Sequence, residues 1–447
     1  MLINKNVLTI NENGRRLSFF SMVFSKAFET LFVNIFSAVT SVMLSGYSEV
    51  AVSVASLSNQ IINLLLMFLD MATIGAVIHM SASMGGNNRK RAGEFSSTAV
   101  FTAGVVSVIT SIVLFMLARL VMVYMNAETE ILDAAVQYLK IRAIFLPVTV
   151  MMRCFNNFLI CNGYSSYTLV SGVLYNVVNA FLCYEVLYGY KAMPISPISG
   201  VAIGNGIACL CGLVFSAGIY RWKKCPFAFC FKKQNLTGIL KLGVPGGMNN
   251  FNYNMAQTVT TALIASLGIS VFNTKVYISS IIVFSSVLSY AIGQAGAVFT
   301  GRYRGRGDFE SINQLYKQNL LMAICANVVV STTIFLFHKP LVGMFTNDSG
   351  VIAAAGKIML IDIAVQIFRA INQVNDQALN ANGDVKTTFT VSVVACWSGS
   401  VFLAWLFGVK LGFGLFGIWM AFLIDEAFKT TVYVIRWRKG KWKTIKI

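Results

Sequence analysis

The chain carries the same run of six apolar, membrane-length segments twice, with the second copy about 220 residues after the first. Short glycine-containing turns recur at matching places, as GGNN at residues 85–88 and GRGD at residues 305–308. Asn162-Gly163 likewise matches Asn382-Gly383. A period of this length is too long for a solenoid and is typical of transporters built from two homologous helical bundles. The sequence therefore predicts two six-helix lobes.

Composition places these segments in a membrane. Of the 447 residues, 56% are apolar and 12% are charged, whereas soluble domains contain about 25% charged residues. The segments reach the roughly 20 residues that a helix needs to cross a bilayer, and they lack the alternation of strands. We therefore predict an all-α integral membrane protein with twelve transmembrane helices. Its spans are expected at residues 19–45, 50–80, 97–122, 131–160, 166–189, 198–221, 240–267, 272–300, 312–337, 351–380, 386–408 and 414–435.

The net charge of +18 is concentrated at one end of these spans. Basic residues gather near residues 89–91, 221–241 and 302–306 and after residue 436. This positive-inside bias predicts a multi-pass protein of the cell membrane with both termini in the cytoplasm, and it argues against a nucleic-acid partner. The same clusters are expected to contact anionic membrane lipids. The predicted parts are an N-terminal lobe at 1–222, a cytoplasmic linker at 223–239, a C-terminal lobe at 240–435 and a basic cytoplasmic tail at 436–447.

Enzyme and cofactor signatures are missing or misplaced. The sequence has no phosphate-binding G-x-x-x-x-G-K-[ST] loop, and its G-x-G-x-x-G at residues 412–417 lies between two apolar spans instead of after a soluble strand. The two histidines, His79 and His338, are far apart, and most of the nine cysteines lie in or at the ends of spans. We expect no catalytic residues, no metal, no disulfide and no cofactor beyond a coupling ion, in a protein that is monomeric.

Polar residues inside the spans are the candidate functional residues. In the tenth span six of them recur at spacings of three and four, which places them on one helix face: Asp362, Gln366, Arg369, Gln373, Asp376 and Asn380. Such a face must line a cavity or pair with another helix, because a charge at mid-membrane costs at least about 2.5 kcal/mol. Two interpretations stay open, an internal network joining Asp362, Arg369 and Asp376 and participation in the substrate or ion path.

The other spans offer further candidates. For ion coupling these are Asp70 in the second span, Glu29 beside Lys26 in the first, and Glu185 near the outer end of the fifth. For the substrate cavity they are Asn59, Asn63, Arg153, Asn156, Asn250, Tyr253, Asn254 and Gln257, together with Gln366, Arg369 and Gln373 of the tenth span. Arg142 falls opposite Asp362 in the repeat, so the two lobes differ in the sign of this charge.

Several motifs resemble one family. The two inner turns at 85–88 and 305–308, LGVP at 242–245, NVVN at 176–179 and GIW at 417–419 look like the multidrug and toxic compound extrusion (MATE) family, over nearly the whole chain. The resemblance implies two six-helix bundles that form a V around a central cleft and export organic, often cationic, compounds against H⁺ or Na⁺. The family often has acids where this sequence has residues 36–40, Cys183, and Tyr253 or Asn254.

These observations predict a secondary exporter of amphipathic or cationic organic compounds that works by alternating access and is driven by H⁺ or Na⁺. The alternative within transport is a flippase for lipid-linked saccharide or lipid, which Arg142, Arg153 and Arg369 would suit because such a substrate carries pyrophosphate. An intramembrane enzyme would need a clustered nucleophile and base, and the sequence shows only scattered candidates. A static channel fits a duplicated two-lobe chain less well than a rocking transporter.

Overall fold

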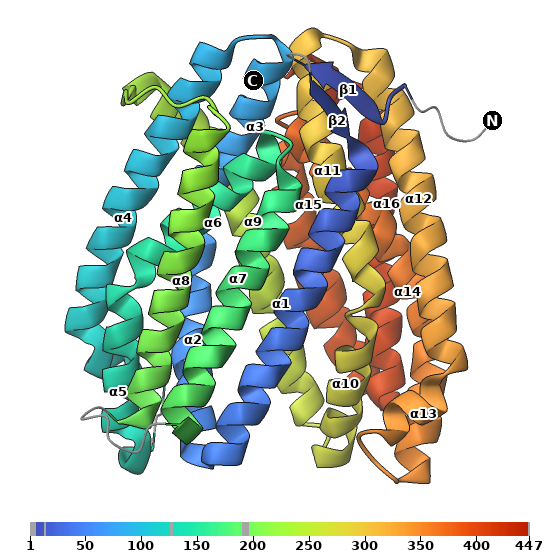
Figure 1. Cartoon of the computed structure of the whole chain (residues 1–447). Coiled ribbons are helices and arrows are strands. Elements are labelled where there is room, and N and C mark those ends of the chain that lie inside the picture. The colour runs from blue at the N-terminus through green and yellow to red at the C-terminus, as the bar shows by residue number, and fades with distance from the viewer. Residues whose placement is uncertain (1–5, 13–14, 126–127, 190–195, 446–447) are drawn as a thin grey trace. The chain divides into compact units, whose positions relative to one another are not determined.

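The computed structural model describes residues 6–12, 15–125, 128–189 and 196–445 (Figure 1). Nearly all of these residues are helical, and two short strands near the N-terminus form the one sheet that they contain. The predicted all-α class is therefore confirmed. The predicted lobe and tail boundaries at residues 1 and 447 lie outside the described residues.

The chain divides into two compact units, and the division falls inside two helices. The first unit is Phe24–Gly247, and the second is Met1–Val23 together with Met248–Ile447. The boundaries lie within α1 (Phe19–Tyr47) and α9 (Lys233–Ala265). The N-terminal 23 residues thus group with the second unit, whereas the sequence analysis assigns residues 1–222 to a single lobe.

Each unit is a bundle of long helices. The first unit contains most of α1 and the start of α9, and between them α2 (Glu49–Leu69), α3 (Met71–Gly85), α4 (Arg89–Tyr124), α5 (Thr129–Ile144), α6 (Leu146–Cys161), α7 (Ser165–Tyr184), the π-helix η1 (Glu185–Gly189) and α8 (Pro197–Trp222). The second unit contains β1 (Thr9–Glu12), β2 (Arg15–Ser18), the rest of α9, α10 (Ile269–Ile282), α11 (Ser285–Arg306), α12 (Phe309–Leu336), α13 (His338–Gly343), α14 (Ser349–Ala381), α15 (Val385–Ala395), η2 (Cys396–Leu403), η3 (Trp405–Lys410), α16 (Gly414–Arg438) and η4 (Lys441–Thr444).

A helix or a helix pair occupies every predicted span. By length and apolar composition, eight of the described helices could cross a membrane, and up to ten if two pairs that bend by 47° and 48° each count as one span. These bent pairs are α5 with α6 and α10 with α11. α9 and α16 are outside this set, although both coincide with predicted spans, because amides in α9 and charges in α16 lower their apolar content.

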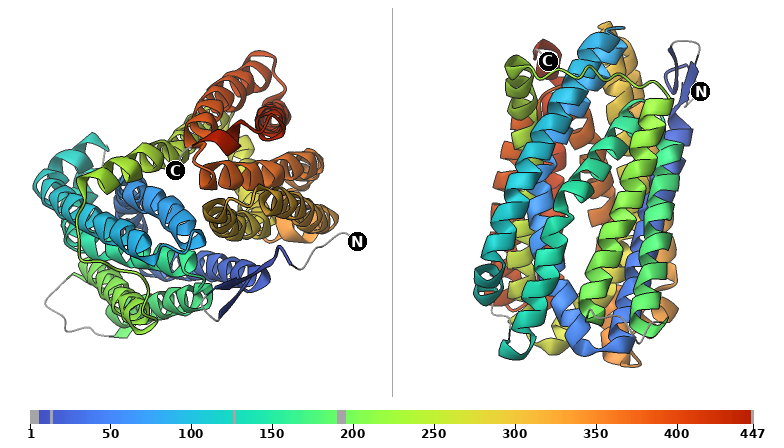
Figure 2. Two further views of the ribbon diagram at one scale, coloured as in Figure 1. Left: turned by 90° about the horizontal axis from the view of Figure 1, so that it is seen from above. Right: turned by 60° about the vertical axis from the view of Figure 1, so that its left-hand side comes forward.

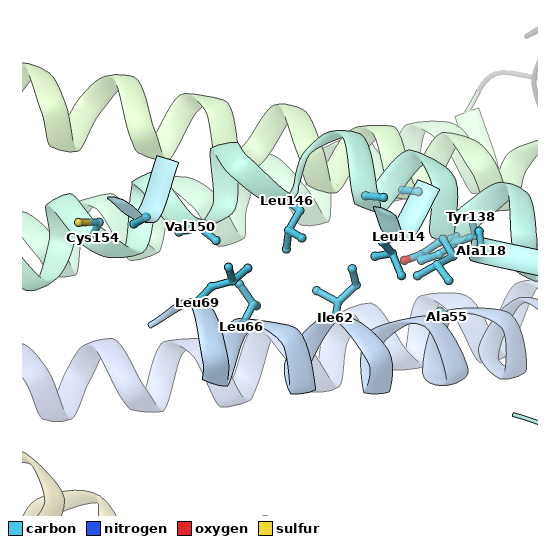
Figure 3. Close-up of a cluster of buried hydrophobic side chains, with 14 of the residues drawn as sticks. Ala55, Ile62, Leu66, Leu69, Leu114, Ala118, Tyr138, Leu146, Val150 and Cys154 are labelled. Atoms are coloured by element: carbon cyan, nitrogen blue, oxygen red, sulfur yellow. The ribbon is translucent and has the colours of Figure 1, made fainter. Parts of the chain in front are cut away.

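Apolar side chains from α2, α4, α5 and α6 form the core of the first unit (Figure 3). Ile62 and Leu66 of α2 are buried toward Leu146 and Val150 of α6. The spacing of four in each pair puts both side chains on one helix face. Many apolar side chains on the outer faces are exposed, as expected for helices that contact lipid.

Two glycines bring α3 and the start of α9 into backbone contact. A Cβ atom on Gly75 would clash with the carbonyl oxygen of Ile239, and one on Gly243 would clash with the carbonyl oxygen of Met71. This close crossing is the arrangement that small residues permit in membrane helix packing. It fixes the start of α9 to the first unit.

Two predicted spans of the first unit each contain two helices. Asp70 lies between α2 and α3 with a helical backbone, and its N–H and carbonyl bond to Leu66 and Ile74, so Glu49–Gly85 forms one continuous span of 37 residues. By contrast, α5 and α6 meet at a bend of 47° next to Pro147, which lacks the backbone N–H that a continuous helix requires.

The N-terminal hairpin packs on the end of α11 within the second unit (Figure 1). β1 and β2 pair antiparallel with Glu12 opposite Arg15. The Tyr303 hydroxyl donates to the carbonyl of Val7 at 3.0 Å, and Arg302, whose side chain is fully buried, lies 3.3 Å from the Glu12 carboxylate. Glu12 of the hairpin therefore supplies the negative charge that faces the buried Arg302.

Candidate functional site

The polar face of α14 packs against α16 in the second unit, and charged residues of both helices meet there. Arg369 Nε lies 3.2 Å from Glu426 Oε1. Lys429 Nζ lies 3.1 Å from Asp425 Oδ2 and 3.6 Å from Glu426 Oε1. The side chains of Asp425, Glu426 and Lys429 are less than one-tenth exposed. These residues therefore form a buried ionic cluster that joins the two helices.

Two further carboxylates on α14 are bonded only to neutral donors. Asp362 accepts from the Trp419 indole at 3.0 Å and from the Gln366 amide at 3.2 Å. Asp376 accepts from the Asn249 amide at 3.2 Å and from the Asn380 amide at 3.2 Å. Among the described residues no Lys, Arg or His nitrogen lies within 4 Å of either carboxylate.

The charges of this region do not balance. Four acids, Asp362, Asp376, Asp425 and Glu426, accompany two cations, Arg369 and Lys429. An excess of buried negative charge in a medium of low dielectric constant is the electrostatic condition for binding a proton or a small cation. We refer to these six residues as the acidic cluster.

The remaining polar residues of α14 have separate partners. Gln373 accepts a hydrogen bond from the Ser289 hydroxyl of α11 at 2.7 Å. Asn380 accepts from Thr388 of α15 at 2.6 Å while its amide donates to Asp376. The polar face of α14 is therefore divided among several neighbouring helices of the unit, and it does not form the single Asp362, Arg369 and Asp376 network that was one interpretation of the sequence.

The residues of the amide-rich helix α9 that bond to other helices of the second unit include Asn249 and Asn252, which are not the candidates that the spacing of its polar residues suggests. Asn250, Tyr253 and Asn254 are exposed within the second unit, and Gln257 is half-buried. Asn254 donates only to the Asn250 carbonyl of its own helix. The residues of α9 that bond to other helices lie beside this stripe. Asn249 donates to Asp376, and Asn252 contacts Ser392 and Trp397.

In the first unit the structure pairs two predicted candidates. The Arg153 guanidinium of α6 forms a two-pronged ion pair with the Asp70 carboxylate at the junction of α2 and α3, with Nε to Oδ2 at 3.1 Å. The Asp70 side chain is 14% exposed and the Arg153 side chain 45% exposed. The pair therefore joins the middle of α6 to this junction.

The other first-unit candidates are dispersed. Glu29 pairs with Lys26 at 3.1 Å and accepts from the Thr168 hydroxyl at 3.3 Å. Asn156 accepts from the Ser216 hydroxyl at 2.6 Å and joins α6 to α8. Glu185 begins η1 beside Gly189, and Asn59 and Asn63 lie on the exposed face of α2.

From the sequence alone, Asp425 and Glu426 could pair with Lys429, four and three residues further along the same helix. The structure adds that Glu426 also binds Arg369 and the Asn372 amide, the latter at 2.8 Å, so this acid connects α16 to α14. The signal in the sequence was three charged residues within five positions of an apolar span. Among the described residues no group of three or more His, Cys, Asp or Glu is placed to hold a metal ion.

Comparisons with known proteins agree with this architecture. The MatE family model matches residues 26–185 and again residues 245–406, so one family pattern occurs twice in the chain. The chain is 27% identical to a transporter from Bacillus subtilis, YisQ, described as uncharacterized, over 96% of this chain and 95% of that protein. It is 24% identical to a probable multidrug resistance protein, NorM, from Thermotoga maritima, over 93% and 90%.

Solved structures show the same fold. A MATE transporter from Vibrio cholerae, VcmN, superposes with a TM-score of 0.88 at 16% identity, over 96% of this chain and 98% of that one. A transporter from Pyrococcus furiosus, of the superfamily abbreviated MOP, gives a TM-score of 0.86 at 14% identity, over 96% of both chains. These likenesses confirm the predicted fold class.

The duplicated bundles of apolar helices and the polar residues inside them define a multi-span membrane transporter. Because the family model covers most of the chain in two copies, the protein belongs to the MATE family.

Proposed function

We propose that this transporter is a secondary exporter of amphipathic or cationic organic compounds, driven by inward movement of H⁺ or Na⁺ through the acidic cluster. The observation that carries the proposal is a pair of carboxylates, the buried Asp362 and the partly buried Asp376, which accept hydrogen bonds from neutral amides and an indole. A carboxylate without a cationic partner can bind a proton or Na⁺ and release it when its surroundings change.

The energy from one coupled ion is sufficient for export. Moving one elementary charge across 100 mV supplies about 2.3 kcal/mol, which corresponds to a substrate gradient of roughly 50-fold. Within the acidic cluster, Arg369 pairs with Glu426 and Lys429 with Asp425, so two of the four acids are already neutralised. This leaves Asp362 and Asp376 as the residues whose protonation or ion binding would change the net charge of the cluster.

The arrangement in the membrane is part of the same proposal. The ends of the helices that carry residues 89–91, 221–241 and 436–443 are proposed to face the cytoplasm of a cell-membrane protein, because cytoplasmic segments carry an excess of Lys and Arg. A cysteine reagent that does not cross membranes tests this orientation. It should label an introduced cysteine at Lys439 only after the membrane is permeabilised.

Export itself is tested with the purified full-length protein in liposomes. The experiment follows efflux of a fluorescent organic cation under an imposed pH gradient and then, separately, under an imposed Na⁺ gradient. Movement driven by one gradient and abolished by its collapse supports the exporter and identifies its ion. No movement under either gradient, with folded protein, would refute the proposal for this substrate class.

One observation favours the flippase alternative. In the first unit the buried Nε of Arg142 has no hydrogen-bond partner among the described residues, and no described acid lies within 4 Å of this arginine. By contrast, Arg153 is paired with Asp70 and Arg369 with Glu426. For the Pyrococcus furiosus transporter, a reverse polarity of the binding pocket is described as suggesting a different function.

A basic residue of this kind would suit an anionic group such as the pyrophosphate of a lipid-linked saccharide. The assay is transbilayer movement of a fluorescent lipid-linked pyrophosphate in the same liposomes. Movement that is lost in Arg142→Gln and is independent of both gradients would favour the flippase. The exporter remains our conclusion because only one of the three interior arginines has no carboxylate partner in the described structure.

A further inference from the structure

The first unit has a basic pocket that the transport mechanism does not use. A pocket of about 440 Å³ lies between the start of α4 and the loop that joins α8 to α9. Three basic residues line it, Arg89 and Lys90 from α4 and Lys224 from the loop, together with Gly93 and residues 225–228. The described lining contains no acid. We refer to it as the basic pocket.

The loop that forms one wall is held in place by specific hydrogen bonds. The Ser96 hydroxyl of α4 donates to the Pro226 carbonyl at 2.8 Å, and the Ser97 hydroxyl donates to the Cys230 carbonyl at 2.9 Å. The buried Tyr220 hydroxyl also donates to the Pro226 carbonyl, at 2.7 Å. The wall is therefore a fixed part of the first unit, as these bonds tie it to both α4 and α8.

Two further contacts hold the loop close to α4 at the basic pocket. Arg89 Nη2 donates to the Lys224 carbonyl at 3.1 Å and joins the two walls. A Cβ atom on Gly93 would lie 3.1 Å from the backbone nitrogen of Phe227, so the glycine allows the loop to approach the helix closely. Arg89, Lys90 and Lys224 are exposed residues, and all three border this one pocket.

The acid nearest in sequence is already neutralised. Glu94 of α4 accepts a hydrogen bond from Lys232 at 2.7 Å, and this bond raises the pKa of the Lys232 ammonium. Arg91 instead stacks on the Phe95 ring, with its guanidinium carbon 5.6 Å from the ring centroid. The charge of Glu94 therefore leaves the positive potential of the basic pocket largely intact.

Exposed aromatic side chains flank the basic pocket. Trp222, Phe229 and Phe231 are 64%, 87% and 48% exposed, and all three lie in or next to the loop. The ring of Phe231 contacts that of Phe101 on the outer face of α4, with centroids 5.0 Å apart. Aromatic residues beside cations are typical of the boundary between membrane and water. Figures 1 and 2 show this loop running beside the start of α4.

An apolar stripe leads away from the basic pocket along α4. Phe101, Val105, Val108 and Ile112 are exposed and recur at spacings of four, three and four, so they share one helix face. Lys90 precedes Phe101 by eleven residues, about three helical turns, and lies on the same face. A ligand with an anionic head and long apolar chains could therefore contact the basic pocket and the stripe together.

We propose that the basic pocket binds the phosphate headgroup of an anionic phospholipid, whose acyl chains lie along the exposed stripe of α4. Three convergent cations and one fixed wall select for negative charge, and the flanking aromatics and the stripe favour a lipid over a soluble phosphate. The site is separate from the acidic cluster, which lies in the other unit.

Native mass spectrometry of the delipidated full-length protein tests the proposal directly. Phosphatidylglycerol and phosphatidylcholine with identical chains are titrated separately into the protein in neutral detergent. The Lys90→Gln/Lys224→Gln variant removes two charges of the basic pocket. Lys339→Gln/Lys357→Gln removes two exposed charges in α13 and α14, outside the basic clusters that are expected to contact anionic lipids, and is the matched control. Thermal unfolding of each variant checks that its fold is intact.

The expected result is a preference for phosphatidylglycerol that falls about 10- to 30-fold in the first variant, or roughly fivefold per charge. The control variant should bind like the unmodified protein. Equal binding of the two lipids, or equal loss in the two variants, would overturn the site. Displacement of the lipid by inorganic phosphate at an equal concentration would overturn its assignment to a lipid.

Discussion

Arg369 is bonded to Glu426 of the neighbouring helix, 3.2 Å away, and not to either acid of its own helix face. Asp362 lies seven residues before it and Asp376 seven residues after it, so all three share one side of α14. Because Glu426 takes the arginine, the two α14 acids bond to neutral donors. The charge of Arg369 is therefore not available to Asp362 and Asp376, and this face of α14 carries uncompensated negative charge.

Asp376→Asn should abolish gradient-driven export while the protein stays folded. An amide cannot release a proton or hold Na⁺ as a carboxylate does, but its one carbonyl oxygen can still accept a hydrogen bond from Asn249 or Asn380. We expect at least a tenfold loss of initial efflux rate in liposomes and a change in unfolding free energy below about 1 kcal/mol.

Asp133→Asn is the matched control for this prediction. Asp133 makes an exposed ion pair with Arg119, and its side chain is 85% exposed, so the same chemical change removes no buried charge. Its efflux should equal that of the unmodified protein. Full residual transport by Asp376→Asn would remove this residue from the coupling mechanism.

The helices of both units could be predicted from the sequence, whereas the partners of the buried charges could not. Hydropathy and segment length are local properties, and they locate α14 and α16 closely. Whether Arg369 meets Glu426 depends on how two helices, 57 residues apart at this contact, rotate against each other.

Asp70→Asn should alter transport and also destabilise the first unit. The substitution leaves Arg153 without the carboxylate that binds two of its nitrogens, at a cost of about 1 kcal/mol for this partly exposed pair. Thermal unfolding and the pH and Na⁺ dependence of efflux are the two measurements. A structural role alone predicts that efflux keeps its pH and Na⁺ dependence.

The double variant Asp70→Asn/Arg153→Gln separates these effects. Removing both charges leaves no arginine that has lost its carboxylate, so most of the lost stability should return. If Asp70 takes part in coupling, the altered pH or Na⁺ dependence should persist in the double variant. Recovery of the original dependence together with stability would assign the pair to packing.

Glu12→Gln should destabilise the second unit even though residue 12 lies nearly 300 residues before Arg302, its ion-pair partner in α11. The fully buried Arg302 would lose a countercharge, and Arg306 would lose an ion pair at 3.0 Å. Removing one partner of a buried ion pair costs about 3 kcal/mol. Thermal unfolding should detect this loss, and Glu128→Gln, which changes an exposed acid before α5, should leave stability unchanged.

The N-terminal hairpin that contains Glu12 could have been predicted from the sequence. Asn13-Gly14 stands between Glu12 and Arg15, and Asn-Gly is the dipeptide most typical of two-residue hairpin connections. The packing of the hairpin on α11 could not be predicted in the same way. It depends on Arg302 and Tyr303, which lie nearly 300 residues along the chain.

Gly75→Ala and Gly243→Ala should each destabilise the first unit by about 2 to 3 kcal/mol. In either variant the new methyl group would clash with a backbone carbonyl oxygen of the facing helix, which cannot move aside as a side chain can. Gly218→Ala is the matched control, because a Cβ atom there meets nothing within 4 Å. It should be neutral or slightly stabilising, since alanine favours a helix more than glycine does. Thermal unfolding of the three variants measures the difference, and equal stability of all three would mean that α3 and α9 do not pack through these glycines.

Because α9 continues from this crossing to Asn249, which donates a hydrogen bond to Asp376, Gly75→Ala and Gly243→Ala should also reduce the efflux rate of the protein that remains folded.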